Sequence, residues 1–243
     1  MMGPMRIVGR LSLLLVLLGP TSSGCALLDG SSRLEEALEY LPAASTTVAF
    51  TDGGNDQDWP ALLADTGLDA TDVVWEAVAT AADGSARVWK TVDDLDFDAV
   101  AARLAGAGHE RSGAADRPTF TAGSATLALV PDEELVVSGS DVDALLAVVT
   151  DDADSLADAG SLGDLLDHAG DQDALEYAAL TLAPPDGCDL TAAALFVPDG
   201  GPVRAVLVPE SGGPRVEEGF GDRAAAVRAF ADQQPPFGCV DPA

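Results

Sequence analysis

The chain has 243 residues, and its 41 acidic side chains against 12 basic ones give a formal net charge of −29. A charge this negative argues against broad contact with nucleic-acid phosphates or with anionic lipid headgroups. Apolar residues make up 47% of the chain, which is too high for a disordered acidic tail and sufficient for a folded core. Two histidines and three cysteines leave little for a catalytic or metal centre.

The first 24 residues have the pattern of a secretory signal. Arg6 and Arg10 come first, a mainly apolar run over residues 11–18 follows, and small residues then lead to Cys25. A transmembrane helix needs about 20 apolar residues, and this run is too short for one. We therefore predict that residues 1–24 are a cleaved signal peptide.

The end of this signal, Ser22-Ser23-Gly24-Cys25, resembles the lipobox of bacterial lipoproteins, in which a small or apolar triplet precedes a cysteine. The family usually has leucine three residues before the cysteine, where this chain has Ser22. The resemblance implies cleavage before Cys25 and attachment of a diacylglycerol to its thiol. Two acyl chains suffice for stable anchoring, so residues 25–32 would form a lipidated tether at the outer, extracytoplasmic face of the cell membrane. Ordinary secretion, with Cys25 left as a thiol, is the alternative.

Cleavage would also change the charge and divide the cysteines. The mature chain would carry a formal charge of −31, because two arginines leave with the signal. Cys188 and Cys239 would remain as one pair, and in an exported protein such a pair predicts a disulfide. The bond would close a loop of about 50 residues and contribute about 3–4 kcal/mol. A metal role is not favoured, because no Cys-x-x-Cys is present.

After the tether, strand and helix patterns alternate. Apolar spacing predicts helices over 33–41, 61–68 and 97–104, and strands over 46–51, 73–80, 86–92, 119–122 and 125–130. Asp83-Gly84 predicts a hairpin turn, and residues 106–117 read as a polar loop. Strand–helix–strand–strand–helix–strand is the order of the ferredoxin-like, split βαβ unit. Residues 33–130 are therefore predicted to form a first α+β lobe.

The remaining residues, 131–243, contain similar ingredients and are predicted to form a second α+β lobe. Strands are expected over 134–138, 175–182, 192–197, 203–208 and 215–220, and helices after Asp141 and over 162–168 and 222–233. The predicted fold is α+β, with two ferredoxin-like lobes of antiparallel sheet. This run of elements, with Ser155-Leu156-Ala157-Asp158 ahead of a short helix, resembles uncharacterised bacterial envelope proteins built from tandem lobes, a resemblance that implies no activity.

Catalytic motifs are missing from the sequence. No Gly-x-Ser-x-Gly segment occurs, and the single lysine, Lys90, has Arg87 where a Ser-x-x-Lys motif needs serine. His109 lacks the second histidine of a zinc-binding helix, and His168 lies at a helix end, where it complements the helix dipole. We therefore predict that the protein is not an enzyme.

One acidic loop offers the ligand types of a Ca²⁺ site, namely oxygen donors on a glycine-containing segment. The candidate ligands are Asp52, Asn55, Asp56 and Asp58. The segment does not match the twelve-residue calcium loop, and a solvated turn that starts a helix is the alternative. No other cofactor is expected.

The three tryptophans are assigned different roles. Trp75 and Trp89 lie on the two strands of the predicted hairpin, where they are expected to face each other and to pack in the core. Trp59, beside the acidic loop and at a helix start, is the candidate for an exposed contact with a partner.

These observations favour a lipid-anchored, extracytoplasmic protein that binds or scaffolds other envelope proteins without catalysis. Its expected partners are the membrane, through the lipid on Cys25, and other envelope proteins, with no nucleic acid. One alternative is a lipoprotein that binds a small cation or a cationic ligand, which the negative field would attract. Another is a hydrolase with an unrecognised carboxylate site, for which no nucleophile and base can be named.

Overall fold

The computed structural model describes residues 32–54, 59, 61–159, 162–170, 172–183, 189–218, 220 and 222–232. The chain divides into two units, Met1–Gly30 and Ser31–Ala243, and every described residue belongs to the second. The predicted signal peptide, residues 1–24, and Cys25 lie outside the described residues.

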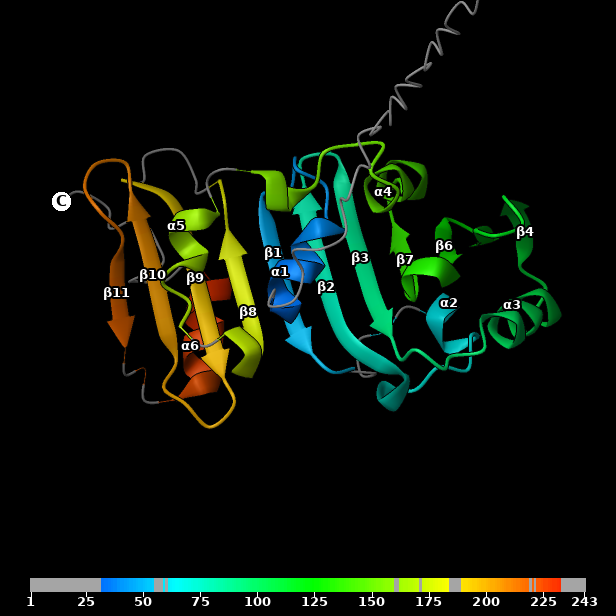
Figure 1. The fold of residues 1–243 in the computed structure, drawn as a ribbon, viewed down its shortest axis with the longest axis horizontal. Coiled ribbons are helices and arrows are strands. Elements are labelled where there is room, and N and C mark those ends of the chain that lie inside the picture. Colours follow the sequence, from blue (N-terminus) through cyan, green and yellow to red (C-terminus); the bar gives the residue numbers. More distant parts are fainter. Residues whose placement is uncertain are drawn as a thin grey trace, which may run out of the picture. The chain divides into compact units, whose positions relative to one another are not determined.

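Eleven described strands form one antiparallel sheet in the order β11-β10-β9-β8-β1-β2-β3-β7-β6-β5-β4 (Figure 1). The strands are β1 (Thr47–Asp52), β2 (Val73–Ala81), β3 (Gly84–Thr91), β4 (Glu110–Gly113), β5 (Pro118–Ala122), β6 (Ala125–Val130), β7 (Leu135–Gly139), β8 (Leu175–Thr181), β9 (Leu190–Pro198), β10 (Arg204–Pro209) and β11 (Arg215–Glu218). The α-helices are α1 (Arg33–Glu39), α2 (Ala61–Ala64), α3 (Phe97–Gly106), α4 (Val142–Val149), α5 (Gly163–Leu166) and α6 (Arg223–Ala231).

The α+β class and the antiparallel pairing are confirmed. All ten predicted strands are present, each with ends within two residues of the prediction. β4 lies within residues 106–117, which were predicted to be a polar loop. β4 has the sequence Glu-Arg-Ser-Gly, which contains no apolar side chain and so no apolar alternation from which a strand could be predicted.

The predicted split βαβ topology is wrong. In that unit a third strand separates the two strands that a helix connects, whereas β1 and β2 are direct antiparallel neighbours, with Thr47 opposite Thr80. On its other side β1 pairs with β8. The strands expected in two separate lobes therefore continue into one sheet, because both edges of β1 are used for pairing.

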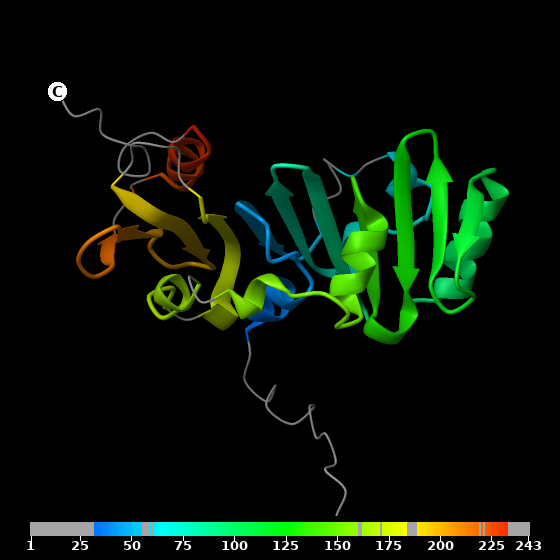
Figure 2. The same cartoon turned by 90° about the horizontal axis from the view of Figure 1, so that it is seen from above.

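Helices cover both faces of the sheet (Figure 2), with α6 on one side and α1 and α5 on the other. On the α1 side, one core joins the helices to the strands; it includes Leu34, Leu38, Phe50, Trp75, Leu145, Leu165 and Leu180. The α6 side has two separate cores. The α3 core includes Leu63, Trp89, Val100, Leu104 and Phe120, and the α6 core includes Leu195, Val197, Ala205 and Phe230.

The predicted helix starts at Asp96 and Asp141 are confirmed. The Asp96 carboxylate accepts a hydrogen bond from the Ala99 amide at 2.9 Å, and the Asp141 carboxylate accepts one from the Ala144 amide at 3.0 Å. Such caps satisfy amides that have no partner inside the helix. Since they depend only on neighbouring residues, they could be predicted from the sequence.

The β2–β3 hairpin is confirmed, with Ala81 opposite Gly84, but its two tryptophans do not face each other. The register places Trp75 opposite Lys90 and Glu76 opposite Trp89. Residues opposite each other share a face of the sheet, and a shift of one residue reverses the face. Both indoles are fully buried as predicted, Trp75 in the core on the α1 side and Trp89 in the α3 core.

Trp75 holds α1 on the sheet. Its indole N–H donates a hydrogen bond to Glu36 of α1 at 3.1 Å, and its ring stacks with Tyr40 at 6.2 Å between centroids. The Lys90 ammonium lies 3.3 Å from carboxylate oxygens of both Glu36 and Glu134. The side chain of the single lysine, 16% exposed, therefore lies between two carboxylates where α1 meets the sheet and reduces the repulsion between them.

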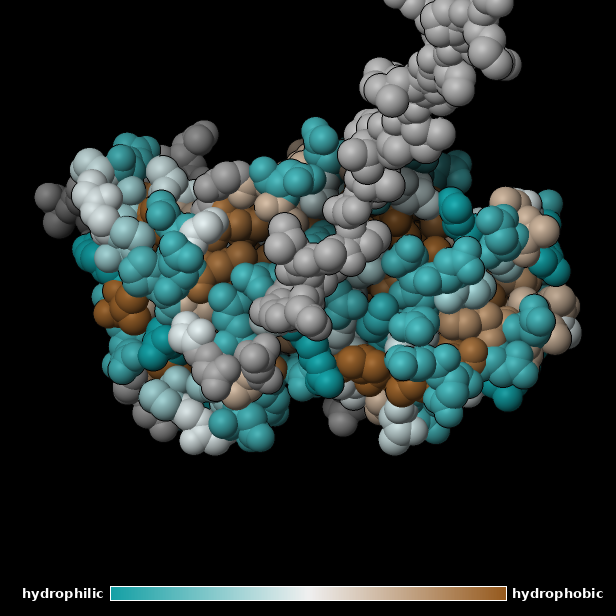
Figure 3. All heavy atoms as spheres, viewed as in Figure 1, coloured by the Kyte–Doolittle hydropathy of each residue, from teal (hydrophilic) through white to brown (hydrophobic). Residues whose placement is uncertain are grey.

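Hydrophilic residues dominate the face of the molecule seen in Figure 3, and apolar residues show between them in small separate areas. Among the described helices, none is both long enough and apolar enough to cross a membrane.

The two edge strands of the sheet are short and charged. β4 contains Glu110 and Arg111, and β11 contains Arg215, Glu217 and Glu218. Both are exposed along their whole length. Charged residues on an open edge discourage pairing with another chain.

Replacing Trp75 with alanine should destabilise the fold by about 3–5 kcal/mol, because a fully buried aromatic side chain leaves a cavity. Trp75→Phe should cost less, because it keeps most of the ring contacts and loses mainly the hydrogen bond to Glu36. Urea denaturation of the two variants measures both effects. A loss below about 1 kcal/mol for the alanine variant would contradict the anchoring role.

Replacing Arg215 and Glu217 together with valine should cause self-association through β11. The double change leaves the net charge unaltered, so any new association reports the lost edge charges rather than a weaker overall repulsion. Light scattering against protein concentration measures it. The matched control replaces Asp116 and Arg117 with valine in the loop before β5 and should stay as dispersed as the parent chain.

Candidate functional site

The predicted Ca²⁺ ligands are only partly described. Asp52 ends β1, and its carboxylate pairs with Arg33 at 2.5 Å. Asn55, Asp56 and Asp58 lie outside the described residues. In the part of the chain that the structure describes, no three histidine, cysteine or acidic side chains are grouped as metal ligands would be. Among the described residues, the charged partner of the Asp52 carboxylate is thus Arg33 of the same chain.

The three cysteines that were assigned roles, Cys25, Cys188 and Cys239, also lie outside the described residues. Their lipidation and disulfide roles stay predictions.

Trp59, the candidate for an exposed contact, is half-buried and packs against the α3 core. Its indole nitrogen is buried and has no hydrogen-bond partner within the described chain. The ring is therefore mainly a packing element of that core.

Both histidines pair with groups close by. The Nε2 atom of His109 lies 2.9 Å from the Asp65 carboxylate, and Nδ1 of His168 lies 2.9 Å from the backbone oxygen of Asp164. Within the described ranges neither ring hydrogen-bonds a hydroxyl or thiol that it could activate. A base without a nucleophile does not make a catalytic pair.

A concave site with an apolar floor lies at the end of the β2–β3 hairpin, and we call it the hairpin cavity. It measures about 450 Å³, within the range of small-molecule sites. Three segments surround it: the hairpin end, the 42–45 turn and the start of α4. The lining side chains are Pro42, Ala44, Ser45, Ala79, Ala81, Asp83, Ser85, Ala86, Ser140, Asp141, Ala144 and Leu145.

Local hydrogen bonds hold these segments in place. The Ser140 amide donates to the Ser85 carbonyl at 2.9 Å, and the Ser85 amide donates to the Ser140 hydroxyl at 3.1 Å. Gly84 allows this approach, because a Cβ there would lie 2.5 Å from the Ser140 side chain. On the opposite wall, the Ser45 hydroxyl donates to the Pro42 carbonyl at 2.7 Å.

The floor and rim of the hairpin cavity differ in chemistry. Ala79, Ala86 and Leu145 form a buried apolar floor. Asp83 and Asp141 lie exposed at the rim, and no lysine, arginine or histidine lines the cavity. The site therefore combines an apolar interior with a negative entrance.

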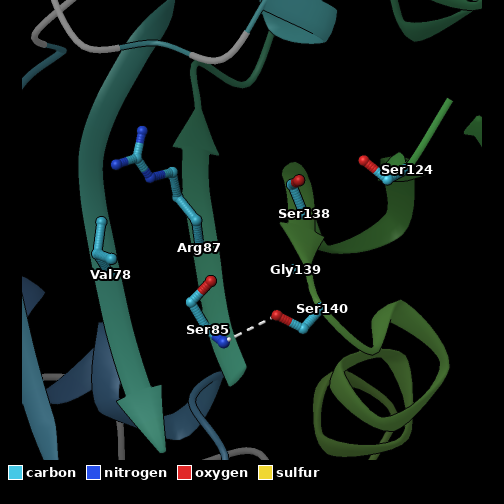
Figure 4. A pocket seen from close by; sticks show the side chains of 7 residues that line it. All are labelled: Val78, Ser85, Arg87, Ser124, Ser138, Gly139 and Ser140. Carbon is cyan, nitrogen blue, oxygen red and sulfur yellow. Dashed lines mark hydrogen bonds between the residues drawn. The ribbon is translucent and has the colours of Figure 1, made fainter. Parts of the chain in front are cut away.

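A second depression of about 440 Å³ lies beside β3 and β7 and shares Ser85 and Ser140 with the first (Figure 4). Its one charged side chain, Arg87, lies 3.4 Å from Glu76 and 5.7 Å from the centre of the Trp89 ring. Since the guanidinium already has these contacts, the second depression does not offer a free cation.

A cluster of acids lies at the end of α1. Burial, followed by the charges of Glu36, Asp151 and Asp158, raises the pKa of Glu39. Burial and the neighbouring Glu133 likewise raise the pKa of the Tyr40 hydroxyl. Neither group lines the hairpin cavity, and these pKa shifts follow from burial and from the neighbouring acids around α1.

Sequence reasoning missed the hairpin cavity. Its lining comes from three segments that lie far apart in the sequence, residues 42–45, 79–86 and 140–145, and its alanines do not stand out in an alanine-rich chain. The Asp83-Gly84 turn and the Asp141 cap were both predicted, but nothing local indicates that they lie at one entrance.

No family model and no curated protein matches the chain. Among solved structures, crystal form III of TP0453 is similar, with a TM-score of 0.51 at 8% identity over 79% of this chain and 85% of that one. Form I has a TM-score of 0.49 at 8% identity over 81% and 84%, and form IV has 0.47 at 8% over 71% and 81%. At this identity, the likeness to form III concerns the fold alone.

Glu39→Gln should stabilise the fold at pH 7 and have little effect at pH 3. A raised folded-state pKa means that the ionised carboxylate is less favourable in the folded than in the unfolded chain. This penalty is complete above the folded pKa and absent below the unfolded pKa, near 4.3. Because the side chain is partly solvated, screening keeps the gain below about 1 kcal/mol. Urea denaturation at both pH values measures it, with Glu210→Gln as an exposed control; destabilisation at pH 7 would contradict the prediction.

Proposed function

We propose that the protein is an exported, lipid-anchored envelope protein that acts by binding and not by catalysis. The observation that carries the binding role is the hairpin cavity, a concave site with an apolar floor and a polar rim. The Ser45 hydroxyl holds a turn, the Ser140 hydroxyl holds the hairpin, and one oxygen of the Asp141 carboxylate caps a helix. A catalytic reading would need an oriented nucleophile and base, and neither described histidine lines the cavity.

The anchor in this proposal is the lipobox-like Ser22-Ser23-Gly24-Cys25. Removal of residues 1–24 would leave Cys25 at the new N-terminus with a diacylglycerol on its sulfur. Six residues separate Cys25 from Ser32, so a fully extended tether would reach about 25 Å. The folded body would then act at the outer face of the membrane.

The charge supports a lipid anchor over charge-driven attachment. The mature chain would carry −31, which anionic headgroups repel. Two acyl chains give stable anchoring without any basic surface. Other envelope proteins are the partners that a scaffolding role would involve.

A disulfide between Cys188 and Cys239 belongs to the same proposal, because an exported protein meets oxidising conditions. It would tie the C-terminal tail to the connection between β8 and β9. The bond would then restrain the chain beyond α6.

Cys25→Ala should abolish lipidation. In cells fed an alkyne analogue of palmitate, the parent chain should be labelled and the label on the Cys25→Ala chain should fall to background, because the acyl chains would be carried by the diacylglycerol on the Cys25 sulfur. The Ser23→Ala variant keeps Cys25 and still has a small residue at position 23, so it should be labelled as strongly as the parent chain. Mass spectrometry should show that the mature chain begins at Cys25.

Undiminished labelling of the Cys25→Ala chain, or a mature N-terminus elsewhere, would overturn the anchor. The binding role of the folded body would then be judged separately, since it depends on the cavity and not on the lipid.

A further inference from the structure

We propose that the hairpin cavity binds a small amphiphile with an apolar body and a protonated amine. The inference rests on the proposed binding role and names the class of ligand. It follows from three features of the cavity: the apolar floor, the negative rim and the position of hydrogen-bond acceptors at the entrance.

The floor determines the apolar part of the ligand. Ala79 and Leu145 are 1% exposed and Ala86 is 8% exposed, so the bottom of the cavity is continuous with the core on the α1 side. The walls add Pro42 and Ala44. These small side chains leave room for alkyl groups, and burying alkyl groups is the main favourable term available there.

The rim determines the charge that the ligand should carry. Asp83 lies exposed in the hairpin turn, and its carboxylate has no hydrogen bond or ion pair with the described part of the chain. Asp141 uses one carboxylate oxygen, Oδ1, to cap α4. This cap offsets the positive helix end, which would otherwise attract an anion. With no basic side chain in the lining, the entrance is negative.

The rim also suits the three donors of an ammonium group. Its acceptors are the carboxylates of Asp83 and Asp141 and the hydroxyl of Ser85. The Ser140 hydroxyl oxygen already accepts the Ser85 amide, so it is less available. An amine at the entrance and an alkyl group on the floor would satisfy both parts of the cavity at once.

Other ligand classes fit less well. A Ca²⁺ ion needs six to eight oxygen ligands, and two rim carboxylates and two rim serines above an alanine floor do not supply them. A carboxylate-bearing amphiphile would be repelled by Asp83 and Asp141. A neutral alcohol would use the floor and leave the rim charges without a partner.

The test uses the purified full chain and three ligands of equal length: hexylamine, hexan-1-ol and hexanoate. Calorimetry at neutral pH and low salt should show hexylamine binding about fivefold tighter than hexan-1-ol, the scale of a partly exposed ion pair. Hexanoate should not bind. Butylamine should bind more than about tenfold weaker than hexylamine, because each buried methylene contributes about fourfold.

Two substitutions test the location. Ala144→Phe on α4 and Ala44→Phe in the turn place a ring in the cavity from exposed positions, and each should abolish hexylamine binding. Ala225→Phe, exposed on α6, is the control and should leave binding unchanged. Circular dichroism confirms that each variant is folded, and two independent filling variants keep the test decisive if one of them fails to fold.

Asp83→Asn tests the charge. It should weaken the binding of hexylamine about threefold and leave the binding of hexan-1-ol unchanged. Asp199→Asn, which removes the same charge in the turn after β9, should change neither. Equal binding of the amine and the alcohol would overturn the cationic class, and binding that survives both filling variants would overturn the site. Because palmitate labelling reports the anchor alone, a chain that labels but binds no amine would overturn only this inference.

Discussion

The attachment of α1 to the centre of the sheet is the constraint on which the rest of the structure depends. Trp75 is fully buried and donates to Glu36 of α1, while Lys90 lies between Glu36 and Glu134. In a chain with 41 acids and a single lysine, this one ammonium allows two carboxylates to lie close together beside a core. Unpaired carboxylates at such a place would be costly.

The register of the β2–β3 hairpin decides what lies on each side of the sheet. It places Trp75 opposite Lys90 and Trp89 opposite Glu76, so each indole supports a different core. The same hairpin brings Gly84 against Ser140, which sets one wall of the cavity. The anchor of α1 and the candidate binding site therefore depend on the same two strands.

The acidic side chains have a different physical effect at each place in the fold. On the edge strands, charges disfavour pairing with other chains. At the end of α1, burial and the neighbouring acids raise the pKa of Glu39. At the cavity entrance, Asp83 and Asp141 remain exposed above an apolar floor. Only this last group combines charge with a concave apolar surface, and for this reason the proposed binding role is placed there.

By itself the sequence determined the α+β class, ten of the eleven described strands, the β2–β3 turn and the caps at Asp96 and Asp141. These features depend on apolar periodicity and on hydrogen bonds between near neighbours, which a chain carries in its local order. Only the tertiary structure decided the strand order, the opposite faces of Trp75 and Trp89, and the cavity. Each of these depends on which distant strands pair and in what register, and a shift of one residue exchanges the two faces of a strand.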